Sequence, residues 1–289
     1  MPANSGTPQV SLVVATADRV EPLVALFESL AMQEEDDFEV ILVDQNVDDR
    51  LAGLVADFEH RFAITHLRTP RRNSSVARNA GLPHCRGEIV GFPDDDCVYL
   101  PDTLARVVES FRAEPMLGAL TGPAQSPDGG LGSGRWAPAR TPIGRHNVFT
   151  TVICFNMFLR RDVLAATGGF DETLGVGAEF GSCEENDLVM RAVQANFPAR
   201  YDPSLRIVHP DKRLTPAARD RAFRYGAGFG RVLRKHRFPV SVVGTFLIRP
   251  VGGFLAALLR LRSLAASYYA LTFWGRLYGF CARASRPAR

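Results

Sequence analysis

Apolar and polar residues alternate along the first 120 residues in a pattern that predicts strands and helices in turn. Short apolar runs rich in Val, Ile and Leu, typical of strands buried on both faces, cover residues 10–15, 38–44, 64–68 and 88–92. Apolar residues at helical spacing, or favourable first residues, predict helices over residues 23–30, 49–60 and 73–82 and from residue 101 onward. The alternation predicts an α/β fold with a mostly parallel, Rossmann-like central sheet flanked by helices.

The second half of the chain departs from this rhythm. Residues 122–147 are rich in Gly, Pro and Ser, so we expect a long, mobile and functional loop there. Beyond it, residues 151–159 form the next apolar run. We therefore expect one domain over residues 9–215, with a donor half at 9–122 and an acceptor half at 147–215, after a disordered segment at residues 1–8.

Residues 216–289 form a helical tail of a different character. Two apolar runs, residues 238–248 and 251–259, stand on either side of the pair Arg249 and Pro250. Neither run reaches the roughly 20 residues of a spanning helix, and an arginine is costly in hydrocarbon. The tail is therefore predicted to lie in a membrane interface. A helix packed on the domain is the alternative.

Charge is distributed unevenly along the chain. From Arg219 onward the sequence has 14 Lys or Arg residues and one acid, whereas the preceding residues have 20 bases and 30 acids. A basic tail favours an anionic partner, and its long aliphatic runs favour an anionic membrane surface and no nucleic acid. Apolar residues are 46% of the chain, the five cysteines show no CxxC spacing, and the first residues lack a signal-peptide pattern. We expect a cytoplasmic protein bound peripherally to the inner face of the cell membrane.

Three consecutive aspartates, Asp94, Asp95 and Asp96, follow the predicted strand at residues 88–92. The carboxyl ends of strands are where open α/β sheets bind ligands. Adjacent carboxylates repel one another, and Mg²⁺ or Mn²⁺ relieves that repulsion through oxygen ligands. The sequence therefore predicts a divalent-cation site, with a solvated acidic turn as the alternative.

Several segments, in this order, resemble family 2 glycosyltransferases of the GT-A fold over about residues 8–212. They are the segments at residues 10–16, 43–46, 77–81, 86–96, 168–172 and 184–188. The resemblance implies a GT-A domain that uses a nucleoside diphosphate sugar and a divalent cation, Mn²⁺ or Mg²⁺.

The resemblance also implies roles for the donor-side residues. Asp96 is expected to be the chief metal ligand, with Asp94 assisting and Asp95 reaching the ribose hydroxyls. His209, after a short predicted strand, is expected to be a further ligand, since imidazole binds Mn²⁺; a structural histidine is the alternative. The expected nucleotide-binding residues are Ala15, Thr16, Arg19, Asp44, Gln45, Arg78 and Asp95.

Two of these assignments have specific alternatives. Arg78, early in a predicted helix, is expected near a phosphate or the base, or else in a surface salt bridge. Gln45 stands where many family members have a second aspartate that bonds uracil. Because an amide both donates and accepts, a UDP-sugar is favoured, with thymidine or guanosine diphosphate sugars open.

On the acceptor side, the resemblance implies that Glu185 is the general base, where aspartate is commoner. Glu184 and Asp187 are expected to be further acceptor-side acids. All three could instead be acids that favour the start of a helix. A general base must come within hydrogen-bond distance of the hydroxyl that it deprotonates.

Together these features predict a metal-dependent inverting glycosyltransferase. Its acceptor is expected to be a saccharide or a lipid-linked molecule, in surface polysaccharide or glycolipid biosynthesis. A sugar-phosphate nucleotidyltransferase is one alternative, although its basic, Gly-rich loop after the first strand is absent from residues 16–19. A non-catalytic, membrane-bound subunit that binds nucleotide sugars is the other.

Overall fold

The computed structural model of the protein describes residues 6–132 and 134–282. The chain packs as two units, one made of Met1–Phe170 and Leu188–Asp211, the other of Asp171–Asp187 and Lys212–Arg289. The predicted boundary at residue 215 falls beside the second stretch of the second unit, which in addition takes residues 171–187 from the predicted catalytic domain. Most of the predicted N-terminal segment at residues 1–8, and the last seven residues of the predicted tail, lie outside the described residues.

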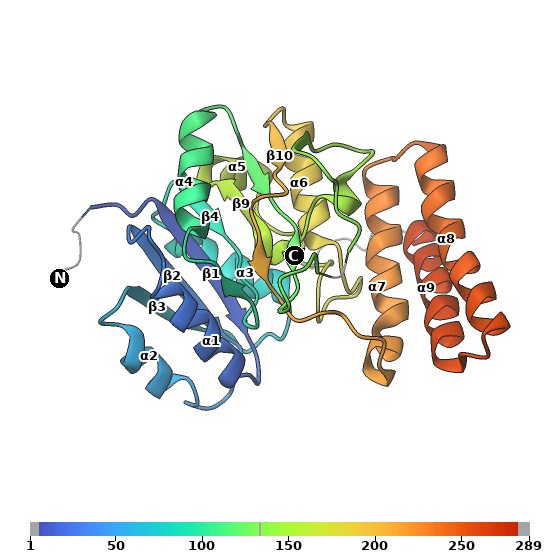
Figure 1. Cartoon of the computed structure of the whole chain (residues 1–289), viewed down its shortest axis with the longest axis horizontal. Helices are drawn as coiled ribbons and strands as arrows, with labels where there is room; N and C mark the ends of the chain where they lie inside the picture. Colours follow the sequence, from blue (N-terminus) through green and yellow to red (C-terminus); the bar gives the residue numbers. More distant parts are fainter. Residues whose placement is uncertain (1–5, 133, 283–289) are drawn as a thin grey trace. The chain divides into compact units, whose positions relative to one another are not determined.

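An eight-stranded sheet forms the centre of the first unit (Figure 1). Its strands are β1 (Val10–Thr16), β2 (Phe38–Asp44), β3 (Ala63–Arg68), β4 (Ile89–Gly91), β6 (Ala119–Thr121), β8 (Thr141–Pro142), β9 (Met157–Arg160) and β10 (Ala199–Tyr201). They lie in the order β3-β2-β1-β4-β9-β6-β10-β8. The first four are parallel, and β9 runs antiparallel to both β4 and β6. The predicted α/β fold is confirmed, and its parallel part is the half that follows the predicted strands.

Helices cover the sheet because β1 and β2 are apolar on both faces. The helices that contribute residues to this unit are α1 (Glu21–Leu30), α2 (Ala52–Phe58), α3 (Ser74–Gly81), α4 (Thr103–Ala113), α5 (Arg161–Thr167) and α6 (Glu184–Gln194), with short 3-10 turns η1 (Leu82–His84), η2 (Val148–Thr150) and η3 (Cys154–Asn156). One core joins Leu12 and Val14 of β1 to apolar residues of α1, α2 and α4. On the other face α3 lies so close that a Cβ added to Gly81 would approach Val13 within 2.6 Å. Asn73 caps α3 by accepting hydrogen bonds from the backbone N–H groups of Ser75 and Val76, as predicted.

A second, three-stranded sheet carries the ligand-binding edge. It contains β5 (Val98–Tyr99), β7 (Ala124–Gln125) and β11 (Ile207–Val208), with β11 in the middle. Because Val208 pairs with Val98, this sheet brings the residue after β11 next to the aspartates that precede β5. The segment at residues 122–147, predicted to be a loop, contributes β7 here and β8 to the large sheet.

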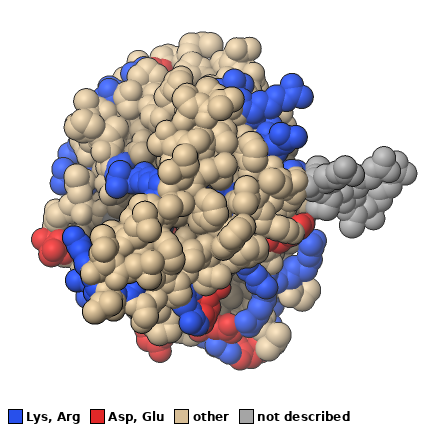
Figure 2. Space-filling view, turned by 90° about the vertical axis from the view of Figure 1, so that its right-hand side faces the viewer, with Lys and Arg blue, Asp and Glu red and all other residues tan. Residues whose placement is uncertain are grey.

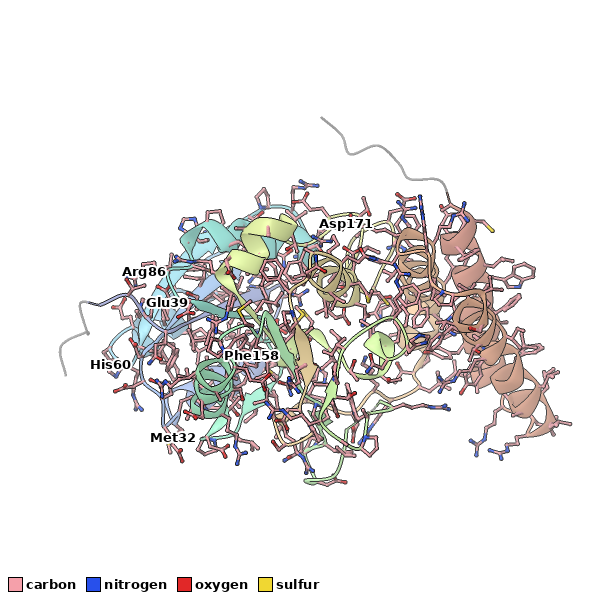
Figure 3. The ribbon with its side chains drawn as sticks, turned by 90° about the horizontal axis from the view of Figure 1, so that it is seen from above. Met32, Glu39, His60, Arg86, Phe158 and Asp171 are labelled. Carbon is pink, nitrogen blue, oxygen red and sulfur yellow. The ribbon has the colours of Figure 1, made fainter. Side chains whose placement is uncertain are left out.

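At the opposite edge of the large sheet, a buried carboxylate closes the amino ends of the strands. Glu39 is 2% exposed and accepts hydrogen bonds from the Ser11 hydroxyl at 2.7 Å and the Arg86 backbone N–H at 2.8 Å. The Arg86 guanidinium also pairs with it (Figure 3). A buried charge that is fully paired in this way holds the turn before β4 in place.

The second unit contains three long helices, α7 (Pro216–Lys235), α8 (Val240–Leu259) and α9 (Ser263–Cys281), which lie side by side (Figure 1). The predicted break at Arg249 and Pro250 is wrong: α8 continues through both residues. Its 20 residues make it, within the described part of the chain, the one helix long and apolar enough to cross a membrane by length and composition.

Candidate active site

The three aspartates lie in the turn between β4 and β5, at the carboxyl ends of the parallel strands. Asp94 forms a parallel bridge with Ala15 near the end of β1, and the Cys97 backbone N–H closes the turn on the Asp94 carbonyl at 3.2 Å. This is the edge of an α/β sheet where ligands bind.

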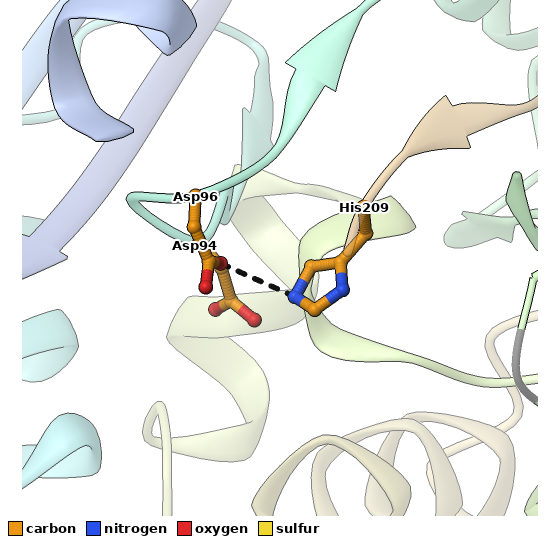
Figure 4. A group of neighbouring side chains, drawn as sticks. All are labelled: Asp94, Asp96 and His209. Carbon is orange, nitrogen blue, oxygen red and sulfur yellow. Dashed lines mark ion pairs between the residues drawn. The ribbon is translucent and has the colours of Figure 1, made fainter. Parts of the chain in front are cut away.

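Asp94 and Asp96 converge with His209 on one point (Figure 4). One ligand atom from each of the three lies within 4.8 Å of the other two, and His209 Nε2 is 3.2 Å from Asp96 Oδ1. Two carboxylates and one imidazole form a donor set that suits Mn²⁺, and carboxylates alone suit Mg²⁺. The structure thus brings together the three residues predicted to bind the metal.

The imidazole of His209 is fixed from two sides. Its ring stacks on Phe155, with centroids 4.4 Å apart and planes within 8°. Its Nδ1 lies 2.8 Å from the Pro210 carbonyl oxygen, so Nδ1–H donates there and Nε2 faces the aspartates. Phe155, which had no signal in the sequence, is therefore part of the site.

Charge at this corner is balanced by arginines. Arg19 Nη1 donates to Asp95 Oδ1 at 2.8 Å and to Asp96 Oδ2 at 2.6 Å, and Arg78 Nη2 donates to Asp94 Oδ1 at 2.9 Å. The Arg19 side chain is 47% exposed, whereas that of Arg78 is 7% exposed. A guanidinium already held by Asp96 shows that these carboxylates accommodate a cation.

Burial and pairing act in opposite directions on the pKa values of this corner. For Asp96 burial raises the pKa, but the His209 hydrogen bond and the Arg19 charge outweigh it and lower the pKa below the ordinary value. Burial lowers the pKa of His209, yet the hydrogen bond and charge of Asp96 raise it overall. For Asp95 burial prevails and raises the pKa. Asp96 is therefore the carboxylate most firmly held in its charged form.

The predicted nucleotide-binding residues surround this corner, but several of their side chains are committed within the protein. Thr16 Oγ1 donates to Asp95 Oδ2 at 2.6 Å. Asp44 is fully buried and accepts hydrogen bonds from the backbone and side chain of Asn46, with His66 Nε2 at 3.1 Å from its other oxygen. The predicted contact of Asp44 with base or ribose therefore stays a prediction that these partners disfavour.

Gln45 and Arg78 also differ from expectation. Gln45 Oε1 accepts from the Asn73 backbone N–H at 2.9 Å, so the amide links the end of β2 to the start of α3. Arg78 lies on Asp94, a metal-ligand candidate, instead of standing free for a phosphate. Sequence reasoning placed both residues at the correct edge and missed their partners.

The acidic residues of the second unit lie in the first turn of α6. Glu184 is 6% exposed and Asp187 is fully buried, whereas Glu185 is only half-buried. The residue before the helix, Cys183, has a φ of 68°, which sets the direction in which the helix starts. Glu185 is thus the most accessible of the three acids.

Asp187 belongs to a buried ion-pair network. Its Oδ1 is 2.8 Å from both His236 Nε2 and Lys235 Nζ, and Lys235 Nζ also lies 2.6 Å from Asp171 Oδ2. Burial raises the pKa of Asp171, but Lys235 outweighs it and lowers that pKa. The network fastens the start of α6 to the end of α7. The structure therefore gives Asp187 a positioning geometry in place of the acceptor contact predicted from sequence.

The comparisons with known proteins identify the family. The model of glycosyl transferase family 2 matches residues 11–166, more than half of the chain. The chain belongs to glycosyl transferase family 2.

Relatives of this family 2 chain have names from polysaccharide biosynthesis. The succinoglycan biosynthesis protein ExoM of Rhizobium meliloti is 27% identical over 239 residues, which are 78% of this chain and 76% of ExoM. The O-antigen biosynthesis protein RfbC of Myxococcus xanthus is 30% identical over 66% of this chain but 15% of RfbC. An uncharacterized glycosyltransferase of Haemophilus influenzae is 28% identical over 40% of this chain and 39% of its own length, so the matches span well under half of these last two relatives.

Solved structures confirm that the family 2 chain has a GT-A-type fold. The mannosyltransferase PcManGT of Pyrobaculum calidifontis, in complex with GDP-Man and Mn²⁺, superposes with a TM-score of 0.69 at 16% identity, over 96% of this chain and 88% of PcManGT. TarS residues 1–349 of S. aureus give a TM-score of 0.61 at 16% identity, over 91% and 90% of the two chains.

Proposed function

We propose that this protein is a metal-dependent, inverting glycosyltransferase. It transfers a sugar from a nucleoside diphosphate sugar to a hydroxyl group of a saccharide or a lipid-linked acceptor. The observation that carries the proposal is the convergence of Asp94, Asp96 and His209 at the carboxyl edge of the sheet, in a chain that belongs to glycosyl transferase family 2.

Asp94, Asp96 and His209 would hold Mn²⁺ or Mg²⁺. When bound, a divalent cation supplies Lewis-acid stabilisation of the diphosphate leaving group. Arg78 orients Asp94, and Phe155 orients His209, because both contacts restrict rotation of a ligand side chain.

Glu185 would act as the general base. It accepts the proton of the acceptor hydroxyl while the acceptor oxygen forms its bond to the anomeric carbon and the bond to the diphosphate breaks. Attack from the face opposite the leaving group inverts the configuration in a single displacement. Glu185 is better suited to this role than Glu184 or Asp187, because those two are buried.

The donor is proposed to be a UDP-sugar. The relevant edge contains Thr16, Gln45 and the aspartates, and structural neighbours bind UDP-GlcNAc or GDP-Man. A thermal-shift series with UDP, GDP and dTDP, each with and without Mn²⁺, tests the base. The proposal expects the largest Mn²⁺-dependent shift with UDP; an equal shift with all three would remove the assignment of uridine.

The pathway is proposed from the names of relatives. ExoM and RfbC act in succinoglycan and O-antigen biosynthesis by their names, so we propose a surface polysaccharide or glycolipid product made at the inner face of the cell membrane. An acceptor of that kind is membrane-bound or close to a membrane.

One assay separates the proposal from its two rivals. A glycosyltransferase releases the nucleoside diphosphate from the donor, slowly to water and faster with an acceptor. A sugar-phosphate nucleotidyltransferase instead releases pyrophosphate from a nucleoside triphosphate and a sugar phosphate. A non-catalytic subunit would bind the donor and release neither product.

A further inference from the structure

Helices α7 and α9 approach each other at pairs of glycines. These are Gly226 and Gly230 on α7, and Gly275 and Gly279 on α9. A Cβ added to Gly230 would lie 2.0 Å from the Arg276 carbonyl oxygen, and one added to Gly279 would lie 1.9 Å from that of Ala227. Small residues four positions apart on both helices allow such close backbone packing. The two helices therefore form one tightly fitted pair.

Helix α8 is attached to this pair along one side. The Phe246 ring packs on Phe229 of α7 at 5.0 Å between centroids, and Arg276 of α9 donates to the Phe246 carbonyl oxygen. Further along, a Cβ on Gly253 would lie 2.7 Å from the ring of Tyr269. These contacts begin near the middle of α8 and continue toward its second half.

The other side of α8 is apolar and exposed. Its most apolar 18-residue window is only 11% buried, which excludes an ordinary core helix. The exposed large apolar residues are Val240, Ile248, Leu255, Leu258 and Leu259. Three of them, Ile248, Leu255 and Leu259, are spaced by seven and four residues and so form one stripe. A contiguous apolar surface of this kind marks an interaction site.

Basic residues accompany the stripe. Arg249, Arg260 and Arg262 are all exposed, and the sequence has no acid after Asp220. Figure 2 shows the side that α8 and α9 face, where the centre is largely uncharged and Lys and Arg gather around it. Anionic lipid complements this charge, whereas a second copy of the same basic segment would repel it.

We propose that α8 binds an anionic lipid bilayer in the plane of the interface. The stripe formed by Ile248, Leu255 and Leu259 faces the acyl chains, and Arg249, Arg260 and Arg262 lie at the phosphates. The inference deepens the proposed function by naming the membrane-binding element, and rests on that function only for the claim that the acceptor is near a membrane.

Packing also argues against a spanning α8. The helix is fastened to α7 and α9, and α7 exposes Arg221, Arg224 and Arg234. A spanning α8 would have to carry these charges into hydrocarbon or lose its contacts with Phe229 and Arg276. In-plane binding requires neither, because only the exposed face of α8 meets the lipid.

Flotation of the full chain with lipid vesicles tests the proposal. The expected result is binding to phosphatidylcholine vesicles with 30% phosphatidylglycerol that weakens as salt is raised. Leu255→Glu with Leu259→Glu should reduce binding at least about tenfold, because two charges would enter the apolar boundary. Arg260→Ala with Arg262→Ala should reduce it by about fivefold for each arginine, and only on anionic vesicles.

The matched control places the same acids on exposed apolar residues of the first unit. Met32→Glu with Met116→Glu should leave vesicle binding unchanged, since both methionines are more than two-thirds exposed and lie away from α8. Equal losses in the control and the α8 variant, or equal binding to neutral and anionic vesicles, would overturn the proposal. A concentration-dependent dimer without lipid, abolished by the α8 change, would show that α8 pairs with a second copy instead.

Labelling of the two ends of α8 tests its orientation. In a Cys281→Ser background, Val240→Cys and Leu261→Cys should both react with an impermeant maleimide added outside protein-bearing vesicles. Protection of one end only would show that α8 spans. Mn²⁺-dependent UDP binding, measured in the same variants, should not change. Loss of vesicle binding with intact UDP binding in the wild type would refute this inference alone, and the converse would refute the proposed chemistry alone.

Discussion

Two carboxylate clusters of this protein contrast in burial and in their partners. At the metal corner, the side chains of Asp94 and Asp96 are 33% and 21% exposed, and the guanidinium on Asp96 comes from the half-exposed Arg19. In the second unit, Asp187 is fully buried against His236 and Lys235. Accessible carboxylates with an exposed cationic partner can exchange that partner for a ligand. A buried carboxylate with buried partners instead fixes the position of the residues around it.

The largest effect is expected at Glu185, which shares a helical turn with Asp187 but is accessible. Glu185→Gln keeps the size of the side chain and cannot accept a proton, so the transfer rate should fall by roughly 10²- to 10⁴-fold. Donor affinity, measured by calorimetry, should hardly change. Glu184→Gln is the matched control; if it abolishes the reaction while Glu185→Gln is mild, Glu184 is the base.

Stability should separate the two clusters next. Asp187→Ala leaves a buried histidine and a lysine without their shared carboxylate, so the free energy of unfolding should fall by about 3–5 kcal/mol. Asp96→Ala removes a partly exposed residue and should cost about 1 kcal/mol or less. Urea unfolding measures both values. Equal costs would show that the metal corner is as structural as the Asp187 network.

Ligand binding should show the opposite ranking. Asp96→Asn should weaken Mn²⁺-dependent UDP binding by more than the roughly 10- to 100-fold that loss of an outer-sphere partner typically causes. Asp95→Asn should weaken it less, since it loses a ribose contact and keeps the ion. Calorimetry on the folded variants checks this. Unchanged affinity in Asp96→Asn would contradict the role of Asp96 as a ligand.

The smallest effect concerns acid stability of the second unit. Lys235 and the surrounding hydrogen bonds lower the pKa of Asp171 despite its burial. Its stabilisation is therefore present above pH 3.8, the ordinary value, and is lost as the pH falls through the lowered folded-state pKa. Unfolding curves of the wild type and Asp171→Asn should differ most above pH 4 and converge at lower pH. A constant difference down to pH 2 would contradict this ion pair.

The sequence predicted the parallel half of the fold because periodicity reports burial directly. The strands at β1 and β2 and the capped helix α3 were found where apolar runs and Asn73 predicted them. The continuous α8 was missed because Pro250 with Arg249 reads as a break, and only the helix context shows that it is tolerated.

For the site, motif order brought Asp94, Asp96 and His209 into one prediction, and the structure brings them into one place. The pairing of Arg19 and Arg78 with these acids, and the burial of Asp187, could not be predicted. They depend on which of several nearby cations reaches each carboxylate, and one sequence does not record that. Phe155 gave no signal because a stacked aromatic residue has the same pattern as a core residue.

Electron paramagnetic resonance of Mn²⁺ bound with UDP tests the central claim most directly. Pulsed spectra of the wild-type complex should show coupling of the ion to an imidazole nitrogen, since His209 Nε2 faces Asp94 and Asp96. The coupling should disappear in His209→Gln, while UDP binding weakens. Bound Mn²⁺ without nitrogen coupling in the wild type, or coupling that survives in His209→Gln, would contradict the proposed metal site.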